Sequence, residues 1–166
     1  MRLTPATEQD IATVSKQLGR PARDIAAIAA RCVCGKPVVV QTFPRLSDGT
    51  PFPTTYYLTH RAATAAVSTL EASGFMAELQ QRLADEPELA EQYAKAHEAY
   101  IRDRDALGMD VPEIDGISAG GMPVRVKCLH ALIGHSLAAG PGVNPIGDLA
   151  LEACTWSPAK CECESE

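Results

Sequence analysis

The sequence lacks two features that would each assign it to a familiar class. It has no apolar run approaching the roughly 18 to 20 residues of a membrane-spanning helix, and its first residues lead into a polar segment instead of a signal-peptide core. It also has no excess of basic residues, because the net charge is -6 and lysine and arginine are scattered singly. We therefore expect a cytoplasmic protein whose principal partners are neither nucleic acid nor membrane.

Standard nucleotide-binding loops and internal repeats are also missing. Neither GxxxxGKS/T nor GxGxxG occurs in the chain. With 166 residues, of which 46% are hydrophobic and 22% charged, the chain has the size and composition of one ordinary globular domain. We expect a single domain over residues 1–151 and a short, acidic, cysteine-containing tail over 152–166.

Hydrophobic periodicity predicts an α+β fold that is mostly helical, with a small β-hairpin or short antiparallel sheet. Thr7 is the expected N-cap of the first helix and Gly19 its stop signal. The second helix would complete a helix-turn-helix, but it has few basic residues, so simple packing is favoured over DNA binding. The expected strands are 38–43 and 54–59, and the expected helices are 7–18, 22–31, 62–70, 76–83, 87–104 and 124–139, with a loop over 140–148.

Six cysteines and four histidines are the most informative residues that the chain does contain. In a reducing compartment such cysteines are more often thiols, metal ligands or catalytic groups than disulfides. Thiolate and imidazole are good ligands for zinc and iron–sulfur centres. If the hairpin forms, Cys32 and His60 flank it at the same end, because one precedes the outgoing strand and the other follows the returning strand.

Spacing limits this metal hypothesis. Cys32-x-Cys34 is tighter than a zinc knuckle, and no second paired motif of that kind is present. On one regular helix, Cys128 and His135 would lie about 10 Å apart along the axis, so both reach one ion only if the helix begins after Cys128. Two alternatives stay open: ordinary core residues, or a catalytic pair in which Cys32 or Cys128 is a thiolate activated by a histidine.

A second candidate site is a small basic group that would bind an anion. Gly120–Pro123 leads into Arg125 and Lys127 at the expected start of a helix, whose free N–H groups favour anions. Arg45, near the hairpin, would add a third cation. The alternative function is therefore an enzyme or sensor that binds a small phosphate or carboxylate ligand.

Two segments carry a family resemblance: RCVCGKPVVVQTFPRLSDGTPFPTTYYLT (31–59) and GGMPVRVKCLHALIGHSLAAGPGVNPIGD (120–148). They resemble the two characteristic blocks of the bacterial family designated domain of unknown function 501, common in high-GC Gram-positive bacteria. The resemblance extends from about Thr7 to Leu151. Genes of this family often lie beside those of enolase, a septum-formation-initiator protein and an exopolyphosphatase. This context implies, as a third alternative, a non-enzymatic adaptor in cell division or envelope growth, with division or phosphate-metabolism proteins as partners.

The resemblance also ranks the cysteines. Relatives have cysteine at positions 32 and 128, and many have cysteine where this chain has His60. A metal site tolerates that exchange, so His60 favours zinc over an all-cysteine iron–sulfur cluster. Cys34 does not match the family pattern, and neither do the tail cysteines, which are therefore expected to be bystanders. The expected metal ligands are Cys32, His60, Cys128 and His130, with His135, His97 and Cys34 ranked lower.

Overall fold

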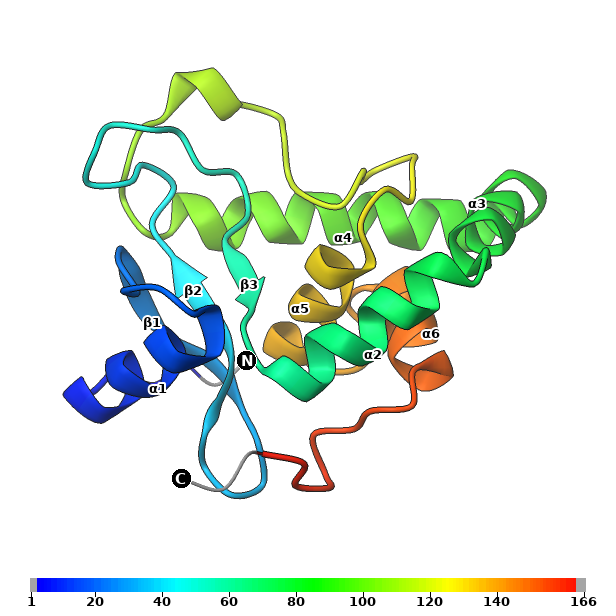
Figure 1. Ribbon diagram of the computed structural model, residues 1–166. Helices are drawn as coiled ribbons and strands as arrows, with labels where there is room; N and C mark the ends of the chain where they lie inside the picture. Colours follow the sequence, from blue (N-terminus) through cyan, green and yellow to red (C-terminus); the bar gives the residue numbers. More distant parts are fainter. Residues whose placement is uncertain (1–2, 164–166) are drawn as a thin grey trace.

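The computed structural model describes residues 3–163, so residues 1–2 of the expected domain and 164–166 of the expected tail lie outside it. Over this range the chain forms six α-helices, one short 3-10 helix and a three-stranded antiparallel sheet (Figure 1). Their bounds are α1 Glu8–Leu18, β1 Ile25–Arg31, β2 Pro37–Thr42, β3 Tyr56–Leu58, α2 Arg61–Ala72, α3 Phe75–Asp85, α4 Pro87–Asp105, η1 Pro112–Ile114, α5 Leu129–Ala139 and α6 Pro145–Ala153.

The sheet brings the start of α2 to the turn between β1 and β2. The strand order is β1-β2-β3, and every residue of the central strand is buried. Arg31 pairs with Pro37 at the end of β1, and Leu58 pairs with Val39 near the end of β3. Cys32 and His60, which follow β1 and β3, therefore lie at the same end of the sheet, as the hairpin prediction required.

Helices cover both faces of the sheet. On one face, α1 packs through Val14 against Ile28 and Val40. The other face packs against α5, which lies between the sheet and α6 (Figure 1). A Cβ at Gly134 would lie 2.9 Å from the carbonyl oxygen of Tyr56, so glycine allows α5 to approach β3 this closely. The main core is thus built around α5, in which eight of the eleven residues are buried.

Several predictions from the sequence are confirmed. The fold is α+β, with the expected antiparallel strands over 37–42 and 56–58. The first helix begins with a capping box between Thr7 and Asp10 and ends at Gly19, whose φ is 73°. Helices α2, α3 and α4 occupy the expected segments, and α4 begins at Pro87. Among residues 3–163, no helix has both the length and the apolarity needed to cross a membrane.

Three predictions of secondary structure are wrong. Residues 25–31 form β1 instead of a second helix, because pairing with β2 and burial outweigh the helical preference of its four alanines. The predicted helix over 124–139 begins only at Leu129, since the N–H groups of Lys127 and Cys128 both donate to the carbonyl of Gly120. Residues 140–148 are not all loop: α6 begins at Pro145 and runs to Ala153, past the expected domain boundary.

Arg31 ties α1 to the turn that follows β1. Its guanidinium donates to both carboxylate oxygens of Asp10, at 2.8 and 2.9 Å, and to the carbonyl oxygen of Gly35 at 2.9 Å. This hydrogen bonding lowers the pKa of Asp10 from 3.8 to about 2. One partly buried ion pair thus holds the position of the cysteine-containing turn relative to the first helix.

Asp10→Asn should reduce the free energy of unfolding by about 2 kcal/mol at pH 7, because each unit of pKa shift corresponds to about 1.4 kcal/mol. Asparagine keeps an acceptor for the N–H of Thr7, so the loss reports the charge. The folded-state pKa is lowered, so the stabilisation is complete above about pH 4 and is lost as the pH falls through about 2.

Urea unfolding at pH 7 and pH 3 checks this, with the difference between the two proteins expected to shrink to about half at pH 3. The exposed Glu98→Gln serves as control and should change neither value. A loss of stability that is independent of pH would contradict the assigned role of the charge.

Candidate metal centre

Two Cys-x-Cys pairs from opposite ends of the chain meet at one point. Cys32 follows β1 and Cys34 lies in the β1–β2 turn, whereas Cys161 and Cys163 belong to the C-terminal segment. The four Sγ atoms all lie within 4.8 Å of one another, and those of Cys34 and Cys163 are 3.4 Å apart. Four sulfurs in such a volume could serve as the donor set of a metal centre.

The β1–β2 turn presents its two cysteines on a rigid backbone. The N–H of Cys32 donates to the carbonyl of Lys36 at 2.8 Å, and the N–H of Gly35 donates to the carbonyl of Cys32 at 2.8 Å. Gly35 has a φ of 94°, which an L side chain rarely adopts, so glycine completes this turn. Together with the clamp from Arg31, these bonds hold both cysteines on one side of the turn.

The C-terminal segment returns to this turn after α6 (Figure 1). Trp156 is 2% exposed and belongs to the main core, and its ring centroid lies 5.4 Å from that of His60. Further on, the carbonyl of Pro158 accepts a hydrogen bond of 3.2 Å from the N–H of Val33. The tail residues up to Cys163 are therefore laid along the hairpin, which delivers the second pair of cysteines to the first.

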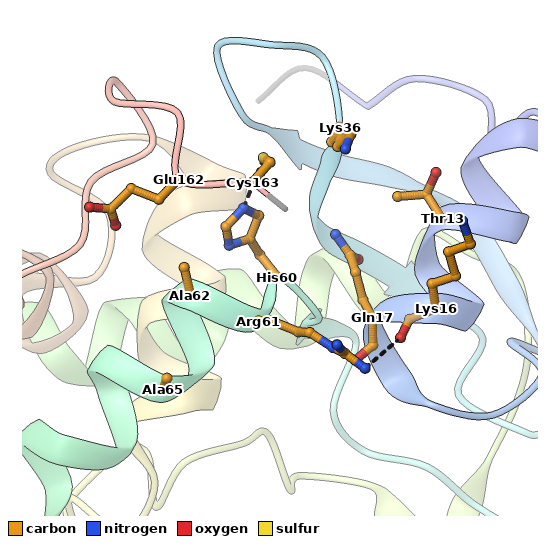
Figure 2. Close-up of a pocket in the computed structure, with 10 residues that line it drawn as sticks. All are labelled: Thr13, Lys16, Gln17, Lys36, His60, Arg61, Ala62, Ala65, Glu162 and Cys163. Atoms are coloured by element: carbon orange, nitrogen blue, oxygen red, sulfur yellow. Dashed lines mark hydrogen bonds between the residues drawn. The ribbon is translucent and has the colours of Figure 1, made fainter. Parts of the chain in front are cut away.

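His60 contacts one of the four sulfurs, that of Cys163 (Figure 2). Its Nδ1 accepts a hydrogen bond from the N–H of Ala63 and caps α2, which leaves the ring proton on Nε2. Nε2 lies 3.1 Å from Sγ of Cys163, so this N–H donates to the sulfur. Burial lowers the pKa of His60, and the ring stays neutral at pH 7.

The thiols differ in how readily they ionise. A hydrogen bond from the backbone N–H of Lys36 lowers the pKa of Cys34 to about 7. Burial raises the pKa values of Cys32 and Cys163. Four adjacent thiolates would repel one another in the absence of a cation, so ionisation of the whole group requires a bound metal ion.

A cavity of about 430 Å³ opens next to His60 and Cys163 (Figure 2). Its walls come from α1, the start of α2, the β1–β2 turn and the C-terminal segment. Three cationic side chains and one anionic side chain line it, namely Lys16, Lys36, Arg61 and Glu162. Part of its wall therefore depends on where the tail cysteines are held.

The structure separates the four residues that were expected to share one ion. Cys32 belongs to the four-sulfur group, and His60 lies beside that group. Cys128 and His130 form a different group with Glu71. The reason is the late start of α5, which places Cys128 at its N-cap and turns His130 toward α2.

The expected anion site is not assembled either. Arg45 forms a two-pronged ion pair with Glu113, at 2.7 and 2.9 Å, so its charge is already matched. Arg125 and Lys127 are exposed in the loop before α5 and line none of the cavities described. Their role as anion ligands stays a prediction.

The two lower-ranked histidines have protein partners. His135 is completely buried between the rings of Tyr56 and Tyr100, and its Nδ1 accepts from Nδ2 of Asn144 at 3.0 Å. Burial lowers the pKa of His135 to about 4, so it packs in the core as a neutral ring. His97 bonds through Nδ1 to the hydroxyl of Ser118 at 2.7 Å.

Sequence reasoning missed Cys34, Cys161 and Cys163, which it ranked low or treated as bystanders. The available signal was the repeated Cys-x-Cys spacing at residues 32–34 and 161–163. It was discounted because the spacing is shorter than that of a zinc knuckle and because the tail looked accessory. Each pair supplies only half of a donor set, so the pairing depends on the fold.

The fold and this group of cysteines define a small α+β domain with a candidate four-sulfur metal centre. The chain belongs to the DUF501 family of proteins of unknown function, whose family model matches residues 28–152. That segment contains Cys32 and Cys34, whereas Cys161 and Cys163 lie beyond it. No curated protein and no solved structure matches the chain.

Proposed function

We propose that this protein binds one zinc ion through the thiolates of two Cys-x-Cys pairs, Cys32 with Cys34 and Cys161 with Cys163. The observation that carries the proposal is the mutual approach of the four Sγ atoms to within 4.8 Å. Four thiolates are a common donor set for structural zinc, which needs no open coordination position. The zinc ion would fasten the C-terminal segment to the β1–β2 turn.

The spacing of the sulfurs favours a single ion over a polynuclear cluster. A tetrahedral site with zinc–sulfur bonds of about 2.3 Å has its sulfurs about 3.8 Å apart. The separation of 3.4 Å between Cys34 and Cys163 and the upper limit of 4.8 Å bracket that value. An iron–sulfur cluster binds its cysteines through separate iron atoms and holds them further apart.

Hydrogen-bond donors surround the sulfurs, as a negatively charged centre requires. Zinc with four thiolates carries two net negative charges. The backbone N–H groups of Cys34 and Lys36 favour the thiolates of Cys32 and Cys34, and Nε2 of His60 donates to Cys163. These donors delocalise the negative charge and orient the sulfurs. Residues that form hydrogen bonds to metal ligands commonly have this role.

The reduced full chain should bind one equivalent of zinc, measured by competition with a chromophoric chelator. Cys34→Ser and Cys163→Ser should each weaken binding by at least about tenfold, because each removes a thiolate ligand. Cys154→Ser is the matched control, since that cysteine lies outside the four-sulfur group. Zinc uptake below about 0.2 equivalents by the unsubstituted protein would contradict the proposal, and so would an equal loss of zinc affinity in all three variants.

His60→Asn tests whether His60 acts by orienting Cys163. Asparagine is a strong N-cap and keeps an acceptor for the N–H of Ala63, but it removes the donor that faces the sulfur. Zinc affinity should fall by about 10- to 100-fold while the stoichiometry stays at one. His97→Asn, remote from the sulfurs, should leave the affinity unchanged. An unchanged affinity in His60→Asn would show that the bond to Cys163 has no such role.

A second candidate function, binding of a small phosphate or carboxylate ligand, is favoured by the cavity beside the sulfurs. Three cations and one anion line it, an excess of two positive charges that favours an anion, and the two negative charges of the adjacent zinc centre would oppose that binding. Inorganic phosphate should raise the melting temperature of the reduced, metal-free protein more than that of the zinc-loaded protein, and Lys16→Gln should abolish that rise. If Lys127→Gln abolishes it instead, the anion binds at the loop before α5.

A further inference from the structure

A second group of reactive side chains lies where α2 meets the start of α5. Glu71 is near the end of α2, Cys128 is the N-cap of α5, and His130 is in the first turn of α5. One ligand atom from each of the three lies within 4.8 Å of the others. Cys128 is partly buried, and the side chains of His130 and Glu71 are 28% and 23% exposed, so the group lies at the protein surface.

The partners of His130 define its protonation. Nδ1 lies 3.2 Å from Oε1 of Glu71, and Nε2 lies 3.3 Å from the carbonyl oxygen of Thr64. The hydroxyl of Ser68 also lies 3.3 Å from Nε2. A carboxylate can only accept, so Nδ1 carries a proton, and a proton on Nε2 would be donated to the carbonyl of Thr64. The nearby sulfur of Cys128, aided by the charge of Glu71, raises the pKa of His130 to about 9. His130 is therefore an imidazolium at neutral pH.

The imidazolium favours the thiolate form of Cys128. Burial alone would raise the pKa of this thiol, but His130 and the backbone N–H of Ala131 outweigh burial and lower it. The charged groups that bear on the sulfur are His130 from α5 and Glu71 from α2, and the neighbouring Lys127 is exposed. The start of α5 adds its partial positive charge.

Glu71 has a fixed orientation that suits a positioning role. Its Oε2 accepts a hydrogen bond of 2.8 Å from the N–H of Leu129, while Oε1 faces His130. The three residues thus repeat the arrangement in which a carboxylate orients an imidazole beside a nucleophile. A metal ion would instead need an unprotonated nitrogen of His130, and Nδ1 already faces the carboxylate of Glu71.

We propose that Cys128, His130 and Glu71 form a reactive-thiolate site whose co-reactants are low-molecular-weight disulfides. The thiolate of Cys128 attacks one sulfur of the disulfide, whose S–S bond breaks as a new S–S bond to Cys128 forms. The other half leaves as a thiolate and takes a proton from water. The group contains a single cysteine among the described residues, so the mixed disulfide persists until an external thiol reverses the exchange. This proposal is independent of zinc binding.

The test uses the zinc-loaded full chain and 2-hydroxyethyl disulfide, an uncharged probe, with peptide mapping by mass spectrometry to locate the adducts. Cys154 is the internal reference, because it is also partly buried but lies outside both groups. At pH 6, Cys128 should react at least about fivefold faster than Cys154, and its rate should reach a plateau at lower pH. Equal reaction rates and equal pH profiles for Cys128 and Cys154 in the unsubstituted protein would overturn the proposal.

His130→Asn should remove the advantage of Cys128 at pH 6 and move its plateau at least about one pH unit higher. His97→Asn, the matched control, should change neither. An unchanged profile in His130→Asn would overturn the role of the imidazolium. A second equivalent of zinc that is lost in Glu71→Gln would overturn the proposal as well, since it would identify the group as a metal site.

Discussion

Burial of Trp156 is the contact on which the candidate metal centre depends. It is the only tryptophan of the chain and is 2% exposed, within the main core and beside the ring of His60. Burying a side chain of this size contributes about 4 to 6 kcal/mol, whereas leaving its buried Nε1 without a partner costs about 1 to 3 kcal/mol. The favourable free energy of burying the side chain therefore exceeds the cost of the unpaired Nε1, and the buried Trp156 keeps this part of the chain against the sheet. Because Trp156 already holds the chain near the sheet, a metal ion at Cys161 and Cys163 needs to order only the short segment after Trp156. The entropy cost is therefore smaller than that of closing a loop across most of the protein.

The other half of the centre is held by charge and turn geometry. Arg31 joins Asp10 of α1 to the carbonyl of Gly35, so the β1–β2 turn keeps one orientation relative to α1. The four sulfurs lie between the buried Trp156 and the ion pair of Arg31. A cavity lined partly by Glu162 and Cys163 lies beside them. A bound zinc ion would fix that wall, which links metal binding to the shape of the cavity. The thiolate group at Cys128 stands apart from this arrangement, on the contact between α2 and α5.

Local signals in the sequence predicted much of the fold. Thr7 and Gly19 mark the ends of α1 because capping is a short-range effect, and the β-branched residues of β2 mark a buried strand. Residues 25–31 were mistaken for a helix because pairing with β2 is long-range and alanine favours a helix in isolation. The start of α6 could have been read from Asn144 followed by Pro145, a cap and first-turn pair. The site was predicted only in part, through Cys32 and the neighbouring His60. Its other three cysteines were ranked too low, because the meeting of residues 34 and 161 depends on the burial of Trp156.

X-ray absorption spectroscopy of the zinc-loaded full chain tests the central claim most directly, because it reports the atoms bound to the metal. The account predicts one zinc ion with four sulfur neighbours at about 2.3 Å and no nitrogen or oxygen in the first shell. A shell that contains imidazole nitrogen would make His60 or His130 a ligand and contradict the four-sulfur centre. A metal–metal distance in the spectrum of the iron-loaded protein, together with no zinc uptake, would contradict it equally.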